Sequence, residues 1–141
     1  MHTEYTTKVS EDELTPKELV ADVFAKWEAG DSSGFFDAVA DDVTWTAIGT
    51  TPISGISHSK TEYMKKTYSP LLAVFSGPTS CKVKRVVAEG DVVVVEWHGE
   101  TPLAKGGVYV NDYCWVVRVK DNKFTEVTGY FDTAAVNALF A

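Results

Sequence analysis

The residues best suited to chemistry lie in the last third of the chain, where one strand pattern carries both aromatic and polar side chains. Tyr109, Asn111, Tyr113 and Trp115 stand at every second position, which is the period of a β-strand and places them on one face. An Asn amide can donate or accept a hydrogen bond, and a Tyr hydroxyl can polarise a carbonyl or enolate oxygen. A mostly aromatic face with a few polar groups is typical of a pocket lining. We therefore expect Asn111, Tyr113 and Trp115 to bind a substrate. For Asn111 the alternative is a structural hydrogen bond to a neighbouring loop.

Asp132 is the first candidate for a catalytic acid or base. It ends the next predicted strand, directly after Tyr130 and Phe131. With Tyr113, Trp115 and Tyr130 around it, the carboxyl group is expected to be partly desolvated, which raises its pKa toward a range useful for proton transfer. Tyr130 is accordingly a further candidate for substrate binding. The alternative interpretation is that Asp132 caps the helix that follows, a role worth about 1 kcal/mol. The two roles are compatible.

Glu96 and His98 form the second candidate pair. They are two residues apart in a valine-rich segment, so they share one face of a strand. A contact between Glu96 and His98, or between His98 and Asp132, can make a proton-transfer dyad. We take His98 as a catalytic candidate and Glu96 as a substrate contact. The alternative places both side chains on the solvated rim or on a dimer face.

Among the other aromatic residues, Trp45 and Tyr63 are the ones that we expect to reach a cavity, although such residues more often belong to a core. No metal site is predicted, because the three histidines and two cysteines show no ligand spacing. The chain has no glycine-rich phosphate loop, and no residue resembles a covalent nucleophile supported by a triad. We expect no cofactor.

Length and composition limit the possible classes of protein. The 141 residues suffice for one domain with a real core, and 45% hydrophobic and 23% charged residues are ordinary for a globular protein. The net charge of -7 argues against nucleic-acid partners and anionic membranes. No apolar run approaches the roughly 20 residues of a membrane span, and the N-terminus does not resemble a signal peptide. Cys81 and Cys114 are interpreted as reduced thiols, so we expect a cytoplasmic protein.

The N-terminal half is predicted to be mostly helical. Residues 1–14 are polar and acidic and are expected to form a flexible tail, followed by a single domain over residues 15–141. Thr15, Pro16 and Glu18 make a capping box that opens a helix ending near Gly30. The sequence then predicts a short second helix from residue 31 or 32, a strand over 43–48, a loop over 49–57, and a third helix that begins at a second capping box (59–62) and is broken near Pro70.

From residue 78 onward the pattern is that of β-structure. Strands are predicted over 81–88 and 92–101, then a hairpin with its turn at 121–122, and finally a short helix over 133–140. Helices that precede an antiparallel run indicate an α+β protein, with the helices on one face of a curved sheet.

This order of elements is accompanied by several local strings. They are Phe24 with Trp27 and Gly30-Asp31, Ala40 to Trp45, Gly90 to Trp97, Gly107 with Tyr109, Asn111 and Tyr113, and Asp121 to Glu126 leading to Tyr130-Phe131-Asp132. In these strings the chain resembles the nuclear transport factor two-like superfamily and, within it, the SnoaL-like polyketide cyclase group, over about residues 16–140.

The resemblance implies a cone-shaped, strongly curved antiparallel sheet wrapped around three N-terminal helices, with a pocket in the open end. Relatives include ketosteroid isomerases, limonene-epoxide hydrolases, scytalone dehydratases, polyketide cyclases and proteins without catalysis, and many are homodimers through the outer face of the sheet. The resemblance also implies that Asp132 lies in the pocket as an acid or base. Two departures matter: Glu96 and His98 stand where the epoxide hydrolases carry an Arg and an Asp, and Trp115 stands about where the steroid isomerases carry an oxyanion-hole acid.

Together these patterns predict a small cofactor-free enzyme that binds an apolar, oxygenated molecule of polyketide, terpenoid or steroid-like character. The expected chemistry is acid-base isomerisation, cyclisation, dehydration or epoxide hydrolysis. The alternative is a non-catalytic small-molecule-binding or dimerisation domain of the same fold. The expected partners are a small-molecule ligand and a second copy of the chain, with neither nucleic acid nor membrane.

Overall fold

The computed structural model of the protein describes residues 14–141, so the predicted N-terminal tail lies, except for Leu14, outside the described residues. The first helix begins as predicted. The Thr15 hydroxyl accepts a hydrogen bond from the Glu18 amide at 3.1 Å, and the Glu18 carboxylate accepts one from the Thr15 amide at 2.9 Å. This capping box satisfies two amides that the helix itself leaves without a partner. The helices are α1 (Pro16–Glu28), α2 (Ser33–Ala38), α3 (Lys60–Tyr63), the π-helix η3 (Met64–Tyr68), α4 (Ser69–Leu72) and α5 (Thr133–Leu139).

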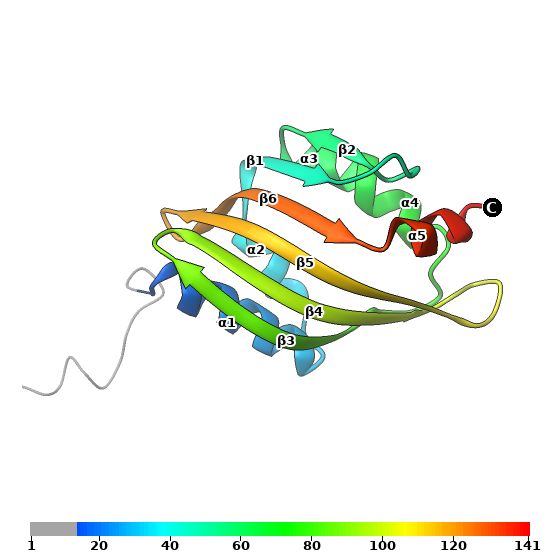
Figure 1. The fold of residues 1–141 in the computed structure, drawn as a ribbon, viewed down its shortest axis with the longest axis horizontal. Coiled ribbons are helices and arrows are strands. Elements are labelled where there is room, and N and C mark those ends of the chain that lie inside the picture. The colour runs from blue at the N-terminus through cyan, green and yellow to red at the C-terminus, as the bar shows by residue number, and fades with distance from the viewer. Residues whose placement is uncertain (1–13) are drawn as a thin grey trace, which may run out of the picture.

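The strands form one six-stranded sheet with the order β2-β1-β6-β5-β4-β3. Figure 1 shows the long strands β3 to β6 running side by side, with β1 and β2 at one edge. Neighbours in this series are antiparallel, except for β1 and β6. The strands are β1 (Val39–Ala47), β2 (Gly55–Ser57), β3 (Ser80–Glu89), β4 (Val92–Pro102), β5 (Val108–Lys120) and β6 (Lys123–Phe131).

The hairpin of β5 and β6 has the predicted turn and the predicted faces. Asp121 and Asn122 both adopt positive φ angles, 52° and 64°, which suits a tight two-residue hairpin turn and residues with short polar side chains. In β5 the side chains of Tyr109, Asn111 and Trp115 are buried, whereas Val110 and Asp112 between them are exposed. The period of two therefore identified the inner face correctly.

Two features of the sheet differ from the prediction. The predicted loop over 49–57 contains the short strand β2, which pairs antiparallel with β1 through Trp45 and Ser57. Strand β1 also pairs parallel with β6, with Trp45 opposite Val127, so the sheet is not wholly antiparallel. Both features depend on pairing between segments that are separated in sequence, which local patterns do not report.

The third predicted helix is divided as expected, but a π-helical segment divides it and not a break at Pro70. The Ser59 hydroxyl caps α3 by accepting from the Glu62 amide. Instead of ending, the helix continues through the π-helix η3, and α4 starts at Ser69 with Pro70 in its first turn. Proline is accommodated there because a first-turn residue needs no backbone donor within the helix. π-Helical segments occur frequently at functional sites.

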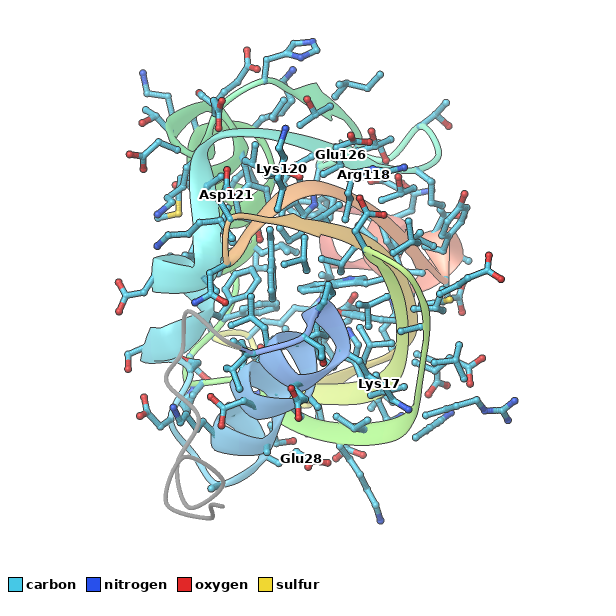
Figure 2. All side chains as sticks on the ribbon, turned by 90° about the vertical axis from the view of Figure 1, so that its left-hand side faces the viewer. Lys17, Glu28, Arg118, Lys120, Asp121 and Glu126 are labelled. Carbon is cyan, nitrogen blue, oxygen red and sulfur yellow. The ribbon has the colours of Figure 1, made fainter. Side chains whose placement is uncertain are left out.

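The sheet bends around α1, as Figure 2 shows in a view turned by 90° from Figure 1. The buried face of α1, which includes Val20 and Phe24, joins the inner residues of β4, β5 and β6 in the main core. The predicted α+β architecture, a strongly curved sheet wrapped around helices, is thus confirmed. Within the described part of the chain, no helix combines the length and the apolar character needed to cross a membrane.

Candidate small-molecule pocket

A cavity of about 190 Å³ lies inside the curve of the sheet. More than half of its lining residues are aromatic, and none is an Asp, Glu, Lys, Arg or His among the residues that the structure describes. The lining residues are Trp27, Ser32, Phe35, Phe36, Trp45, Ala47, Ile53, Tyr63, Thr67, Tyr68, Leu71, Phe75, Pro78, Thr79, Trp97, Tyr109, Tyr113, Trp115, Gly129, Phe131 and Val136.

Four of the predicted binding residues line this cavity together: Trp45, Tyr63, Tyr113 and Trp115. The rings of Trp45 and Tyr63 stack with centroids 4.1 Å apart, and Trp115 meets Trp45 edge-on at 5.1 Å. Trp115 also meets Trp97 edge-on at 5.3 Å. Aromatic pairs favour such stacked and T-shaped arrangements, which hold the rings in place. The wall of the cavity is therefore a connected aromatic cluster.

One polar part of the wall is a chain of hydrogen bonds along β5. The Asn111 Nδ2 donates to the Tyr109 hydroxyl oxygen at 2.7 Å, and the hydroxyl oxygens of Tyr109 and Tyr113 lie 3.0 Å apart. Asn111, which is only 3% exposed, does not line the cavity itself but supports Tyr109 from behind. Burial raises the pKa of both tyrosines, so the hydroxyls remain protonated and act as hydrogen-bonding groups.

Asp132 lies at the end of β6 but not in the cavity lining. Its side chain is exposed, and its carboxylate accepts hydrogen bonds from the amides of Ala134 and Ala135 at 3.0 and 3.4 Å. Asp132 is thus the N-cap of α5, the alternative that the sequence left open. The expected enclosure of its carboxylate by Tyr113, Trp115 and Tyr130 is not found, because the carboxylate is directed to the first amides of α5 instead.

Glu96 and His98, the candidate residues of β4, lie on the outer face of the sheet. Their neighbour Trp97 faces inward, so the alternation of the strand directs Glu96 and His98 outward. Glu96 pairs with Arg85 at 3.1 Å. His98 lies between Asp112, 2.9 Å from its Nδ1, and Glu100, 2.8 Å from its Nε2. The expected placement of His98 and Glu96 in the pocket is wrong, and His98 does not contact Asp132.

Tyr130 was also expected to line the pocket, and its placement differs too. Its side chain is 49% exposed, and it lies opposite Cys114 in the pairing of β5 with β6, on the outer face. It faces outward because Gly129 and Phe131, its neighbours, are directed toward the cavity. Among residues 14–141, no group of three or more His, Cys, Asp or Glu side chains is arranged to hold a metal ion.

The family comparison matches residues 20–127, which is most of the chain, to the SnoaL-like domain. The chain belongs to the SnoaL-like domain family. This SnoaL-like domain has no match among curated proteins.

Solved structures similar to this SnoaL-like domain share its fold at low identity. An NTF2-like protein of Burkholderia thailandensis is 22% identical, with 91% of this chain and 98% of that chain covered and a TM-score of 0.74. TerC, co-crystallised with polyporic acid, is 22% identical over 89% of this chain and 98% of its own, with a TM-score of 0.71. IdmH of Streptomyces antibioticus is 16% identical, with 89% of this chain and 97% of that chain covered and a TM-score of 0.66. A polyketide cyclase activity has been ascribed to IdmH.

Several lining residues of the SnoaL-like domain were not singled out from the sequence. Trp97 was missed because Glu96 and His98 were expected in the pocket, and the alternation of a strand then directs the residue between them away from it. Tyr109 carried a clearer signal, because it shares a strand face with Asn111 and Tyr113. Thr67 stands four residues after Tyr63, a helical spacing that predicts a shared buried side, although the π-helix η3 in which it lies is not predicted by a local pattern.

Proposed function

We propose that this SnoaL-like domain binds an apolar, oxygenated small molecule in its aromatic cavity. The observation that carries the proposal is the combination of an uncharged aromatic wall with the hydrogen-bonded hydroxyls of Tyr109 and Tyr113. Apolar walls with a few convergent polar groups are the usual composition of ligand sites, in which the apolar surface supplies affinity and the polar groups supply orientation.

The size of the cavity limits the ligand. An engineered apolar cavity of about 150 Å³ in another protein binds benzene. The cavity of about 190 Å³ here is therefore suited to one ring or two small fused rings in the conformation that the structure describes. The co-crystal of TerC with polyporic acid and the activity ascribed to IdmH support a small-molecule ligand.

Filling the cavity tests the proposal. Ala47 lines it and is 4% exposed, so Ala47→Leu places three additional carbon atoms in the ligand space. The matched control is Ala134→Leu, at an exposed position of α5. The probes are indene and 1-indanone, which share one fused bicyclic skeleton. At a concentration ten times Kd, a ligand stabilises the native state by about 1.4 kcal/mol, which raises Tm by a few degrees.

We expect the shift in the wild type and in Ala134→Leu, and its loss in Ala47→Leu. If neither probe shifts Tm in the wild type, or if Ala47→Leu retains the full shift, ligand binding in this cavity is refuted.

Acid-base catalysis is the second candidate function. The observation in its favour is the position of Asp132, which directly follows the cavity-lining Phe131. Burial raises the pKa of Tyr109, and the negative charge of Asp132 contributes to the increase. In this proposal Asp132 removes and returns a proton during isomerisation, cyclisation, dehydration or epoxide hydrolysis. Asp132→Asn preserves a capping oxygen and removes the base, so turnover should disappear while binding and stability persist. Turnover that survives in this variant excludes Asp132 as the base.

We also propose a homodimer through the outer face of the sheet. Large apolar side chains are exposed there, including Val87, Val110 and Tyr130, and exposed apolar patches mark interaction surfaces. Light scattering should give a mass near twice 15.4 kDa. Tyr130→Lys should shift it toward the monomer, and Thr61→Lys, on the exposed side of α3, should not. A monomer mass for the wild type contradicts the proposal.

The unpaired cysteines support the expected cytoplasmic location.

A further inference from the structure

We infer that Asn111 sets the direction of the hydrogen bonds in the cavity wall, so that Tyr113 offers a hydrogen-bond donor to the ligand. The cavity then selects uncharged molecules that carry an acceptor oxygen, such as aryl ketones. This ligand class rests on the binding function proposed above. Asn111 is a positioning residue in this scheme, because it acts on the ligand through the two tyrosines.

The orientation of the Asn111 amide is determined by the backbone of Asp132. The Asp132 N–H can only donate, so the Asn111 atom 2.9 Å from it must be the oxygen, Oδ1. The nitrogen Nδ2 therefore lies on the other side, where it donates to the Asp132 carbonyl oxygen at 3.1 Å and to the Tyr109 hydroxyl oxygen at 2.7 Å. If the amide were reversed, Nδ2 would face the Asp132 N–H, donor against donor. Oδ1 would then face the Asp132 carbonyl oxygen, acceptor against acceptor.

This orientation decides the next bond in the chain. The Tyr109 oxygen already accepts from Asn111, and the Tyr113 oxygen is 3.0 Å away, a distance at which either hydroxyl can donate. Whichever hydroxyl donates, the hydrogen of the other has no acceptor among the described residues. The two arrangements differ in burial, because Tyr109 is only 5% exposed whereas Tyr113 is half-buried. A buried donor without a partner is the costlier arrangement. The favoured arrangement has Tyr109 donating to Tyr113.

Tyr113 is then the end of the chain, and its own hydrogen has no acceptor within the described part of the protein. Because Tyr113 lines the cavity, a ligand atom can accept that hydrogen. Burial raises the pKa of Tyr113, so the hydroxyl donates as a neutral group at physiological pH. Hydrogen bonds in series also polarise one another, which strengthens the terminal donor. A charged ligand would lose its hydration without meeting an opposite charge in the lining.

Three probes of one shape separate the possibilities: 1-indanone carries an acceptor, indole carries an N–H donor, and indene carries neither. In the wild type, 1-indanone should bind about three- to tenfold more tightly than indene, the range expected for one neutral hydrogen bond, and indole should gain nothing over indene. Tyr113→Phe should abolish the advantage of 1-indanone and leave the affinity for indene unchanged. The matched control Tyr130→Phe, on the outer face, should retain the wild-type order.

Asn111→Asp tests the direction itself. A carboxylate has no hydrogen to give to Tyr109, so Tyr109 would donate to it, Tyr113 would donate to Tyr109, and the Tyr113 oxygen would face the ligand as an acceptor. The preference should reverse, with indole binding more tightly than indene and 1-indanone losing its advantage. A purely structural role of Asn111 would weaken all three probes alike.

The possible results distinguish failure of the donor assignment from failure of the binding function. If indene binds the wild type but 1-indanone gains nothing, or if Tyr113→Phe keeps the advantage of 1-indanone, the donor assignment is overturned while the binding function stands. If no probe binds, the binding function itself fails, and the ligand class fails with it. Should Asn111→Asp not fold, the comparison of Tyr113→Phe with Tyr130→Phe still decides the donor assignment.

Discussion

The indole of Trp115 lies across the backbone of Gly129, its partner in the neighbouring strand. A Cβ atom at Gly129 would be only 3.3 Å from Trp115 Nε1 and 3.4 Å from its Cδ1. The position opposite the largest side chain of β5 thus has no side chain of its own. Because both residues line the cavity, this pair determines how far the Trp115 ring lies from the ligand space.

Gly129→Ala should destabilise the protein by about 1–3 kcal/mol, the usual cost of overpacking. The contact is tight, and Trp115 cannot retreat easily because it is in edge contact with Trp45 and Trp97. Urea unfolding measures the effect. The control Gly34→Ala, with nothing within 4 Å of the added methyl group, should instead stabilise α2 by about 0.5–1 kcal/mol. Equal effects of the two substitutions would contradict the packing argument.

Asp132→Ala should lower the free energy of unfolding by about 1 kcal/mol, because the amides of Ala134 and Ala135 lose their acceptor at the start of α5. Asp132→Asn should lower the free energy of unfolding by at most about 0.3 kcal/mol, since Asn is an equally good N-cap. The hydrogen bonds between Asn111 and Asp132 involve the Asp132 backbone and survive both substitutions. An equal loss of stability in the two variants, measured by urea unfolding, would show that the cap is not the source.

His98 should make stability depend on pH. Hydrogen bonds to Asp112 and Glu100 raise the pKa of His98 above its ordinary 6.5, so the folded state favours the protonated ring. The stabilisation is complete below about pH 6.5 and is lost as the pH rises through the raised pKa. The side chain is 28% exposed, so the effect is that of a surface ion pair, at most about 1 kcal/mol. The stability advantage of the wild type over His98→Gln should shrink between pH 6 and pH 9, and a constant difference would refute the assignment.

The two thiols should differ in reactivity. Cys81 is buried, and burial raises its pKa to about 12, so the reactive thiolate is nearly absent at neutral pH. Cys114 is only partly buried and lies opposite Tyr130 on the outer face. Native labelling with a maleimide, followed by mass spectrometry, should modify Cys114 first and Cys81 only under unfolding conditions. Dilution that speeds the labelling of Cys114 would indicate that a second copy covers this face.

Local rules were sufficient for the parts of the fold that they govern. The capping box at Thr15 and the side-chain cap at Ser59 involve residues three positions apart, and the turn at Asp121 and Asn122 needs only two residues that tolerate positive φ. The predicted box at Ser59 is only half formed, because the Glu62 carboxylate accepts from the His58 amide instead. The inner face of β5 was correct because the alternation there separates aromatic residues from charged ones.

The placement of the β4 residues could not be predicted with the same certainty. Valines occupy both faces of β4 before Glu96, so the alternation shows which residues share a face but not which face is inside.

Asp132 shows a second limit of prediction from the sequence. A carboxylate at the junction of a strand and a helix can point into the pocket or toward the first amides of the helix. The tertiary arrangement of α5 decides between these directions, and the sequence does not display that arrangement.

All four tryptophans of the chain are part of the cavity wall, and their rings lie close together, with Trp27 and Trp97 only 4.8 Å apart between centroids. Excitation can migrate between indoles at such separations. The intrinsic fluorescence of the protein therefore has no contribution from tryptophans elsewhere, and a quencher beside any one ring should dim the emission of the whole group. The tryptophan emission of the protein therefore reports whether a quenching molecule has entered the cavity.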